Sequence, residues 1–231
     1  MLDEKISFIK RTGIINDYLV ICDHSSNNIP PKYNNLCISK KIINSHRAFD
    51  IGASEVASEL SNLLECNLVM ANFSRLLIDP NRGDDDPTLI PKISEGEIIK
   101  GNLNISLLKN DKERNKRINN FYQPYHDQIS KFINIAFSEN KIPKILSIHS
   151  FTPMWKGKKR ETDVGILWDK DDRLSEIFLS SFNNLNLGNN KPYSGRLKND
   201  TLYRHATMSG LPHVLIELRQ DLLKKKKDRL Q

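Results

Sequence analysis

Three short apolar runs along the chain each lead into polar residues, and they predict the strands around which the fold is built. The first run, residues 18–22, stops at Asp-His-Ser-Ser-Asn-Asn and two prolines, which cannot continue a strand. The second, residues 145–148, leads into His-Ser-Phe-Thr-Pro, and the third, residues 211–218, carries a single carboxylate. Because open α/β sheets place their ligand sites at the carboxyl ends of strands, we expect these three ends to meet at one site.

Other segments alternate between strand and helix patterns. Strands are predicted near residues 6–9 (an edge strand) and at 67–71, 76–78 and 164–168, and helices at 50–64, 111–137 and 171–182, with a further helix start at Ser39. The first of these helices shows Ile51, Val56, Leu60, Leu63 and Leu64 near one face, and the second is expected to kink or break at Pro124. Residues 79–89, 94–110 and 185–201 are predicted to lack regular structure, the first of them as a loop over the site. Strands alternating with helices predict a three-layer α/β/α sandwich.

The composition is that of an ordinary globular protein. The 231 residues are 38% apolar and 27% charged, which suits one domain, expected over residues 1–223. No apolar run reaches the roughly 20 residues that a membrane span needs, and the N-terminus lacks a signal-peptide core. Three widely spaced cysteines suit neither a disulfide framework nor a cysteine zinc site, so we expect reduced thiols and a cytoplasmic location.

Most of the net charge of +7 comes from the end of the chain. Residues 224–231 carry five positive charges and one negative charge, which leaves +3 for the rest. We therefore expect a solvated basic tail. The body lacks the basic helix and interleaved aromatics of a nucleic-acid-binding surface, so neither nucleic acid nor a membrane is expected as a partner. A non-catalytic protein that binds RNA or an acidic partner through this tail is the alternative of a different class.

Two histidines in similar surroundings are the best candidates for metal ligands. His24 and His149 each end an apolar strand and enter a turn rich in serine, where a neutral imidazole is a good zinc ligand. Two histidines usually need a carboxylate to complete a catalytic zinc site. Asp50 is the preferred third ligand, although its position also suits a helix N-cap, and Asn27 is a weaker rival.

The remaining candidates would perform or support hydrolysis. Glu217 interrupts a buried strand, where a carboxylate is costly unless paired or functional. It is our candidate for the base that accepts a proton from a metal-bound water, with an ion pair to Arg219 or another arginine as the alternative. Arg75 and Arg82 could hold a substrate carboxylate or stabilise an oxyanion, or instead pair with the acidic residues at 79 and 84–86.

Two further residues are assigned to the substrate site, although the sequence around them is less informative. Arg196 follows a glycine in Pro-Tyr-Ser-Gly-Arg and supplies a third arginine. His126, in Gln-Pro-Tyr-His, could face substrate, support the ligands or lie on the surface. No phosphate-binding glycine loop and no Gly-x-Ser-x-Gly nucleophile motif occur, so the pattern favours metal-assisted hydrolysis.

Taken together, these motifs resemble those of the N-formylglutamate amidohydrolase family. The resemblance runs from about residue 18 to 223 and rests on HSSNNIP (24–30), FDIGA (49–53), SRLLIDPNR (74–82), PYH (124–126), IHSFTP (148–153), NKPYSG (190–195) and IELRQDL (216–222). It implies a zinc-carboxypeptidase-like α/β/α fold with a central mixed sheet, one Zn²⁺ per chain, and hydrolysis of an N-acyl amino acid.

The resemblance also implies roles for individual residues. Asn81 and Arg82 look like the pair that holds the substrate carboxylate in related zinc enzymes, and Arg75 looks like the oxyanion-stabilising arginine. The His-x-x-Glu ligand pair of zinc carboxypeptidases is absent, because position 27 is Asn. The Phe-Asp-Ile-Gly segment suggests a branch distinct from the dedicated histidine-degradation enzymes. A zinc carboxypeptidase or muramoyl amidase acting on a peptide is the alternative enzyme.

Overall fold

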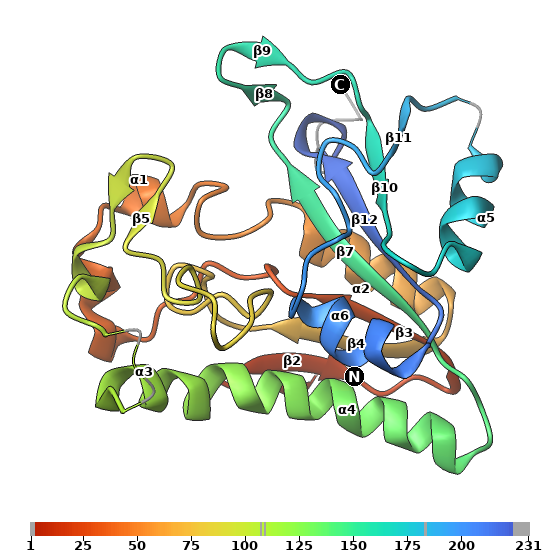
Figure 1. Cartoon of the computed structure of the whole chain (residues 1–231), viewed down its shortest axis with the longest axis horizontal. Helices are drawn as coiled ribbons and strands as arrows, with labels where there is room; N and C mark the ends of the chain where they lie inside the picture. Colours follow the sequence, from red (N-terminus) through yellow and green to blue (C-terminus); the bar gives the residue numbers. More distant parts are fainter. Residues whose placement is uncertain (1–2, 107, 109, 183, 224–231) are drawn as a thin grey trace.

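Figure 1 shows a computed structural model of the chain, which describes residues 3–106, 108, 110–182 and 184–223. The strands of the main sheet are Asp3–Glu4 (β1), Phe8–Arg11 (β2), Ile15–Cys22 (β3), Cys66–Ala71 (β4), Lys144–Phe151 (β7), Val164–Leu167 (β10), Leu187–Asn189 (β11) and His213–Arg219 (β12). Two separate hairpins pair Ile93–Ser94 (β5) with Glu97–Ile98 (β6), and Met154–Trp155 (β8) with Lys158–Lys159 (β9). The α-helices are Lys40–Ile43 (α1), Ala53–Leu63 (α2), Lys112–Arg117 (α3), Gln123–Ser138 (α4), Arg173–Ser181 (α5) and Thr201–His205 (α6). Short 3₁₀ turns cover Pro31–Cys37, Lys100–Asn102, Thr207–Ser209 and Gln220–Leu222.

The main sheet has eight strands in the order β1-β2-β4-β3-β7-β12-β10-β11. Its central strands β4, β3, β7 and β12 are parallel, whereas β2 is antiparallel to β4 and β10 is antiparallel to β12. The predicted mixed α/β class is therefore confirmed, and so is a mixed sheet. Since the parallel strands all end at the same edge, the polar residues that follow them lie close together.

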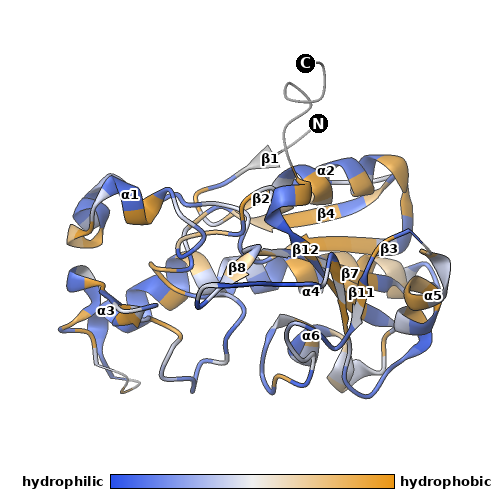
Figure 2. Cartoon of the chain, turned by 90° about the horizontal axis from the view of Figure 1, so that it is seen from above, coloured by the Kyte–Doolittle hydropathy of each residue, from blue (hydrophilic) through white to orange (hydrophobic). Residues whose placement is uncertain are grey.

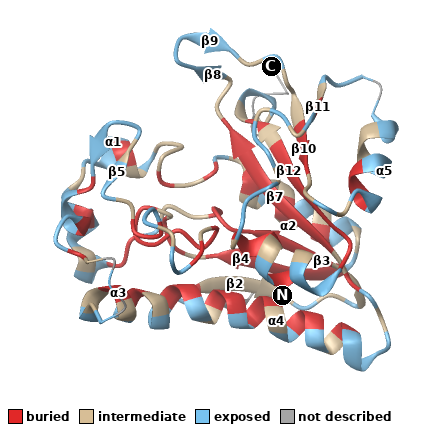
Figure 3. Ribbon diagram, viewed as in Figure 1, coloured by how far each residue is buried: buried red, intermediate tan, exposed pale blue. Residues whose placement is uncertain are grey.

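Successive residues of the central strands enter two different apolar cores. In β3, Leu19 and Ile21 pack on the side of α4, whereas Val20 and Cys22 pack on the side of α2 and α5. Helices thus cover both faces of the sheet, and its central strands are apolar and buried (Figures 2 and 3). Burial on both faces explains why these strands read as continuous apolar runs in the sequence.

The long helix predicted over residues 111–137 is present, with a change of geometry near Pro124. It runs from α3 through a π-helical turn, Ile118–Tyr122, into α4. The helix starts at Asp111, as predicted. The Asp111 side chain caps this end by accepting a hydrogen bond from the Arg114 N–H, at 2.8 Å. Proline has no N–H to donate to the carbonyl four residues earlier, which accounts for the irregular turn directly before it.

The prediction of a strand at residues 76–78 is wrong. This segment is buried but forms a turn and an extended connection. Side chains replace the hydrogen bonds of a sheet: Asn102 donates to the Leu76 carbonyl and Arg117 to the Leu77 carbonyl, each at 2.8 Å. An apolar run can be buried outside a sheet when its backbone groups are satisfied in this way.

The predicted face of the helix at residues 50–64 is confirmed only in part: Val56, Leu60 and Leu64 pack against the core and are partly buried, whereas Ile51 and Leu63 are exposed. The helix begins only at Ala53, and its fully buried positions are Ala53, Ala57 and Ser61, one face at a spacing of four. Leu63 is 76% exposed. Small residues face the sheet here because the helix lies close to β3 and β4, so size decided burial more than hydrophobicity did.

Two segments expected to be irregular contain short strands. Residues 94–110 include part of the β5–β6 hairpin, and residues 185–201 include β11, which pairs in parallel with β10. Their sequences are polar and too short to show alternation. The basic tail, residues 224–231, lies outside the described residues. No helix in the described ranges is long and apolar enough to cross a bilayer.

Candidate active site

Neighbouring strands place the predicted residues at one edge of the sheet. β3 ends directly before Asp23 and His24. β7 pairs in parallel with β12, and His149 lies opposite Glu217, so both side chains leave the same face of the sheet. His149 lies inside β7, which continues to Phe151, and not in a loop after the strand as expected. The strand order thus brings together residues far apart in the chain.

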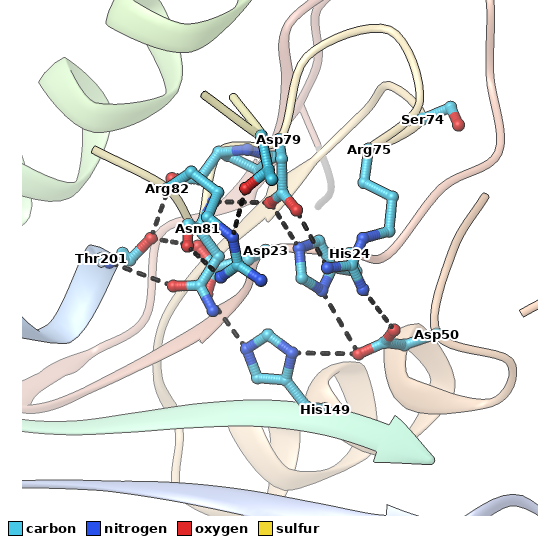
Figure 4. Close-up of polar contacts among 12 residues, drawn as sticks. Asp23, His24, Asp50, Ser74, Arg75, Asp79, Asn81, Arg82, His149 and Thr201 are labelled. Atoms are coloured by element: carbon cyan, nitrogen blue, oxygen red, sulfur yellow. Dashed lines mark hydrogen bonds and ion pairs between the residues drawn. The ribbon is translucent and has the colours of Figure 1, made fainter. Parts of the chain in front are cut away.

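Asp50 faces these histidines instead of capping a helix. Gly52, with a φ of 84°, is the N-cap of α2. The Asp50 Oδ2 atom lies 2.9 Å from His149 Nδ1 and 3.5 Å from His24 Nδ1, and it accepts the Ser150 N–H at 3.2 Å (Figure 4). The N-cap alternative is therefore wrong.

The residues His24, Asp50 and His149 have the spacing of a metal site. One ligand atom from each lies within 4.8 Å of the others, and all three residues are buried. Two atoms bonded to one tetrahedral zinc lie about 3.3 Å apart, close to the two Nδ1–Oδ2 distances. Among the described residues, the buried His24 Nδ1 has no hydrogen-bond partner, as expected of an atom kept for a metal. Asn27 instead donates to Ile43 and Asn44.

Two carboxylates missed by the sequence analysis hold the far sides of the imidazole rings. Asp79 Oδ1 lies 2.8 Å from His24 Nε2, and Asp23 Oδ2 lies 3.1 Å from His149 Nε2. Metal-ligating histidines commonly donate their second ring N–H to a carboxylate, which fixes the ring and makes its free nitrogen more basic. Both aspartates end buried apolar segments, a signal that could have identified them.

The carboxylates around His149 favour its protonated form. Burial would lower the pKa of His149, but its hydrogen bonds to Asp23 and Asp50 and their charges raise that pKa well above its usual value. Burial alone would raise the pKa of Asp23, whereas the hydrogen bond and charge of His149 lower it to about 2. The carboxylates therefore attract positive charge, and a divalent cation would replace the imidazolium proton.

Glu217 is buried beside this cluster, and no residue in the described ranges forms an ion pair with it. Its side chain lines the cleft, and Oε2 lacks a hydrogen-bond partner among the described residues. Burial and the charge of Asp50 raise the pKa of Glu217 to about 7, although His149 partly offsets them. The alternative of an ion pair with Arg219 is wrong, because Arg219 pairs with Asp163 and Asp221.

A glycine makes room for this carboxylate. Gly165 on β10 pairs with Glu217 on β12. A Cβ atom at residue 165 would lie 2.4 Å from the Lys191 carbonyl oxygen and 3.2 Å from the Glu217 Cβ. Any larger residue would displace the backbone beside Glu217.

The arginines Arg75 and Arg82 lie in the same cleft, which has a volume of about 570 Å³. Arg75 Nη2 bonds to Asp79 Oδ2 at 2.9 Å, and its Nη1 lies 3.7 Å from Asp50. The pairing alternative thus holds for Arg75, yet its guanidinium still reaches the cleft. Arg82 donates to the Asn81 carbonyl at 2.9 Å and to Thr88 Oγ1 at 3.2 Å, well placed to meet an anion.

Two residues assigned to the substrate site do not line this cleft. His126 is buried and lies between the Pro80 carbonyl, 3.1 Å from Nε2, and His205, 2.9 Å from Nδ1. It therefore supports the backbone next to Asn81 from behind. Arg196 Nε lies 4.0 Å from Asp169 Oδ1, and the Arg196 side chain is 69% exposed and does not line the cleft.

Replacing Asp79 by Asn is expected to weaken metal binding without removing a ligand. The amide keeps the size of the side chain but removes the charge that orients His24 and strengthens it as a donor. We expect zinc affinity to fall by about 10–100-fold, measured by competition with a chromophoric chelator. Asp172→Asn, at an exposed position that does not line the cleft, is the control and should leave affinity unchanged. An affinity equal to wild type in Asp79→Asn would rule out this support.

Comparisons with known proteins identify the family of the chain and related structures. The family model for N-formylglutamate amidohydrolase matches residues 16–224. The structure of gene product Atu2144 from Agrobacterium tumefaciens superposes with a TM-score of 0.89 at 34% identity, over 97% of this chain and 89% of that one. An N-formylglutamate amidohydrolase from Ralstonia eutropha JMP134 shares the fold, with a TM-score of 0.64 at 20% identity over 94% of this chain and 87% of that one. No curated protein matches the chain.

Proposed function

Because the chain belongs to the N-formylglutamate amidohydrolase family, we propose that it hydrolyses the amide bond of an N-formyl or other N-acyl amino acid. N-formyl-L-glutamate or a similar acidic compound is the proposed substrate, and one Zn²⁺ per chain the proposed cofactor. The products are the free amino acid and, from a formyl substrate, formate. The observation that carries this proposal is a buried glutamate, whose Oε2 has no hydrogen-bond partner among the described residues, beside a buried His-Asp-His cluster in one cleft.

The residues present fit a zinc ion. His24, Asp50 and His149 supply two nitrogens and one oxygen, the donor set of many catalytic zinc sites, which keep a further position open. When bound there, zinc lowers the pKa of water toward about 7 and polarises a carbonyl group. Asp79 and Asp23 keep each imidazole in the orientation that presents Nδ1 to the ion.

Glu217 performs the proton transfers in this proposal. Its carboxylate accepts a proton from the attacking water and then donates it to the leaving nitrogen, so that the amine departs neutral. A pKa of about 7 suits both halves of this cycle, because the group can gain and lose a proton near neutral pH. Its position opposite His149 on the neighbouring strand holds it next to the metal ligands.

The cationic side chains bind charge on either side of the reacting carbon. Arg75, fixed by Asp79, donates to the oxygen that becomes negative in the tetrahedral intermediate. Arg82 and Asn81 bind the carboxylate of the amino acid. The Asn81 side-chain oxygen accepts the Thr201 N–H at 3.0 Å, which leaves its amide N–H groups to donate to an anion.

Formate release from a panel of N-formyl amino acids tests this function. Zinc-loaded protein is expected to hydrolyse N-formyl-L-glutamate, and Arg82→Lys should raise KM about tenfold with little change in kcat, because lysine keeps the charge but loses the two-pronged donor. Arg173→Lys, on the surface, is the matched control. Absence of hydrolysis across the panel would refute the function, and an unchanged KM would remove Arg82 from the carboxylate site.

The other expectations remain predictions of lower rank. A zinc amidase that acts on a small peptide would use the same residues and differ only in the panel. A zinc-carboxypeptidase-like sandwich is supported by helices on both faces of the mixed sheet. A cytoplasmic location rests on the sequence. Binding of RNA by residues 224–231 would require salt-sensitive binding that is lost when they are deleted.

A further inference from the structure

The outer end of the cleft is lined by aromatic side chains that the proposed chemistry does not use. Phe151, Trp155 and Tyr193 line the same cleft as the His-Asp-His cluster. Trp155 is 45% exposed and Tyr193 is 44% exposed, so large ring surfaces face solvent there. Exposed rings grouped in a concave site are typical of surfaces that bind an apolar part of a ligand.

These rings are held in place by one arginine. The Arg160 guanidinium carbon lies 5.2 Å from the ring centroid of Phe151, 5.3 Å from that of Trp155 and 5.0 Å from that of Tyr193. Its Nη1 also donates to the Tyr193 hydroxyl at 2.8 Å. Arg160 thereby ties the β8–β9 hairpin to the loop around Tyr193 and makes a fixed aromatic wall, defined here as Phe151, Trp155 and Tyr193. A wall that is already ordered loses little entropy when a ligand packs on it.

The wall begins at the end of β7, beyond His149 and away from Asn81 and Arg82 in Figure 4. In Figure 4, Asn81 and Arg82 lie to one side of His149, and β7 runs from His149 toward Asp50 on the other side. β7 ends at Phe151, and the β8–β9 hairpin extends from that end (Figure 1). A substrate whose carboxylate meets Arg82 and whose amide lies at the cluster therefore directs its acyl group toward the wall.

The cleft has room for an acyl group larger than formyl. Pockets of roughly 300–1,000 Å³ hold drug-sized ligands, and the cleft has about 570 Å³. A formyl group adds a single carbon beyond the amide nitrogen, so the rings would stay in contact with water. A flat ring on the acyl group would instead cover them by offset or edge-to-face packing.

We propose that the aromatic wall is an acyl-group subsite and that the protein prefers amino acids N-acylated with an aromatic acid over N-formyl amino acids. The orientation of the substrate rests on the function proposed above. Arg160 is a positioning residue, since it fixes the rings and does not line the cleft itself.

A pair of ligands that differ only in the acyl group tests the proposal. The affinities of N-benzoyl-L-glutamate and N-formyl-L-glutamate are measured by calorimetry on zinc-loaded Glu217→Gln protein, which should not consume them. Their kcat/KM values are measured on wild-type protein. We expect the benzoyl compound to bind at least tenfold more tightly and to be hydrolysed with at least a tenfold higher kcat/KM.

Variants of two residues in β8 then test whether Trp155 causes the preference for the benzoyl compound. Trp155→Ala should weaken binding of the benzoyl compound about tenfold and that of the formyl compound less than twofold, while Trp155→Phe should keep most of the preference. Met154→Ala is the matched control, because successive strand residues point to opposite sides and Met154, 50% exposed, does not line the cleft.

The outcomes separate this proposal from the proposed function. Equal affinities for the two ligands, absence of binding, or an equal effect of Trp155→Ala on both would overturn the aromatic subsite, even if formate is released. A benzoyl preference lost in Trp155→Ala supports the subsite, even if neither compound is hydrolysed. Hydrolysis alone decides the amidohydrolase function.

Discussion

Replacement of Glu217 by Gln is expected to remove nearly all turnover while zinc stays bound. Glutamine has almost the same shape, so the cluster of His24, Asp50 and His149 is left intact. It cannot accept a proton from water or return one to the leaving nitrogen. Loss of a positioned acid–base group lowers rates by about 10²–10⁴-fold, and we expect kcat to fall by at least this factor with KM little changed.

Zinc content and kinetics measured on the same preparation make this result interpretable. Glu176→Gln, at an exposed position of α5, is the control and should retain full activity. Because the base must be ionised, kcat/KM of the wild type should decrease as the pH falls through the pKa of Glu217. Burial raises that pKa to about 7 in the metal-free protein, and a bound dication would lower it again. Activity near the wild-type level in Glu217→Gln would exclude this residue as the base.

Loss of zinc and of hydrolysis together is expected for His149→Ala and His24→Ala. Each change removes one of three protein ligands, and the two that remain bind zinc too weakly to retain it through purification. Elemental analysis of protein prepared without chelator or nickel affinity should give about one zinc per chain for wild type and little for either variant. His46→Ala is the control for zinc content, since His46 pairs with Glu95 at the rim of the cleft.

Removal of His149 takes one hydrogen-bond partner from each of the buried carboxylates Asp23 and Asp50, which destabilises the fold. The melting temperature is therefore measured for each variant.

Chelation of the wild-type protein tests the metal site without a mutation. Chelator-treated wild type should lose activity and regain it with one equivalent of zinc. Wild type that contains no zinc and binds none when it is offered would contradict the metal site, as would a His149→Ala protein that keeps its zinc.

Pattern in the sequence was sufficient for the central strands of the main sheet and for the residues near their ends. Apolar runs bounded by turn formers identified the central strands, because a strand buried on both faces must be apolar throughout. His24, His149 and Glu217 stood out for the same reason, as polar residues at or near the ends of such runs. These features depend on neighbours a few residues away, which a single sequence displays directly.

Contacts between distant segments were decided only by the tertiary structure. The strand order places Asp50 against His149, 99 residues away, and Asp23 against the same ring from the other side. Leu76 and Leu77 were mistaken for a strand because the side chains that bond their carbonyls, Asn102 and Arg117, come from elsewhere in the chain.

The aromatic wall is another feature that only the tertiary structure determines. Phe151, Trp155 and Tyr193 belong to three different segments, and none forms a recognisable motif by itself. Local patterns report which side chains are buried, since burial follows the period of a strand or helix. Which side chains contact one another depends on how the strands pair and where the loops place their residues. The sequence therefore determined the central strands and the candidate ligands. The tertiary structure determined the partners of those residues and the shape of the cleft.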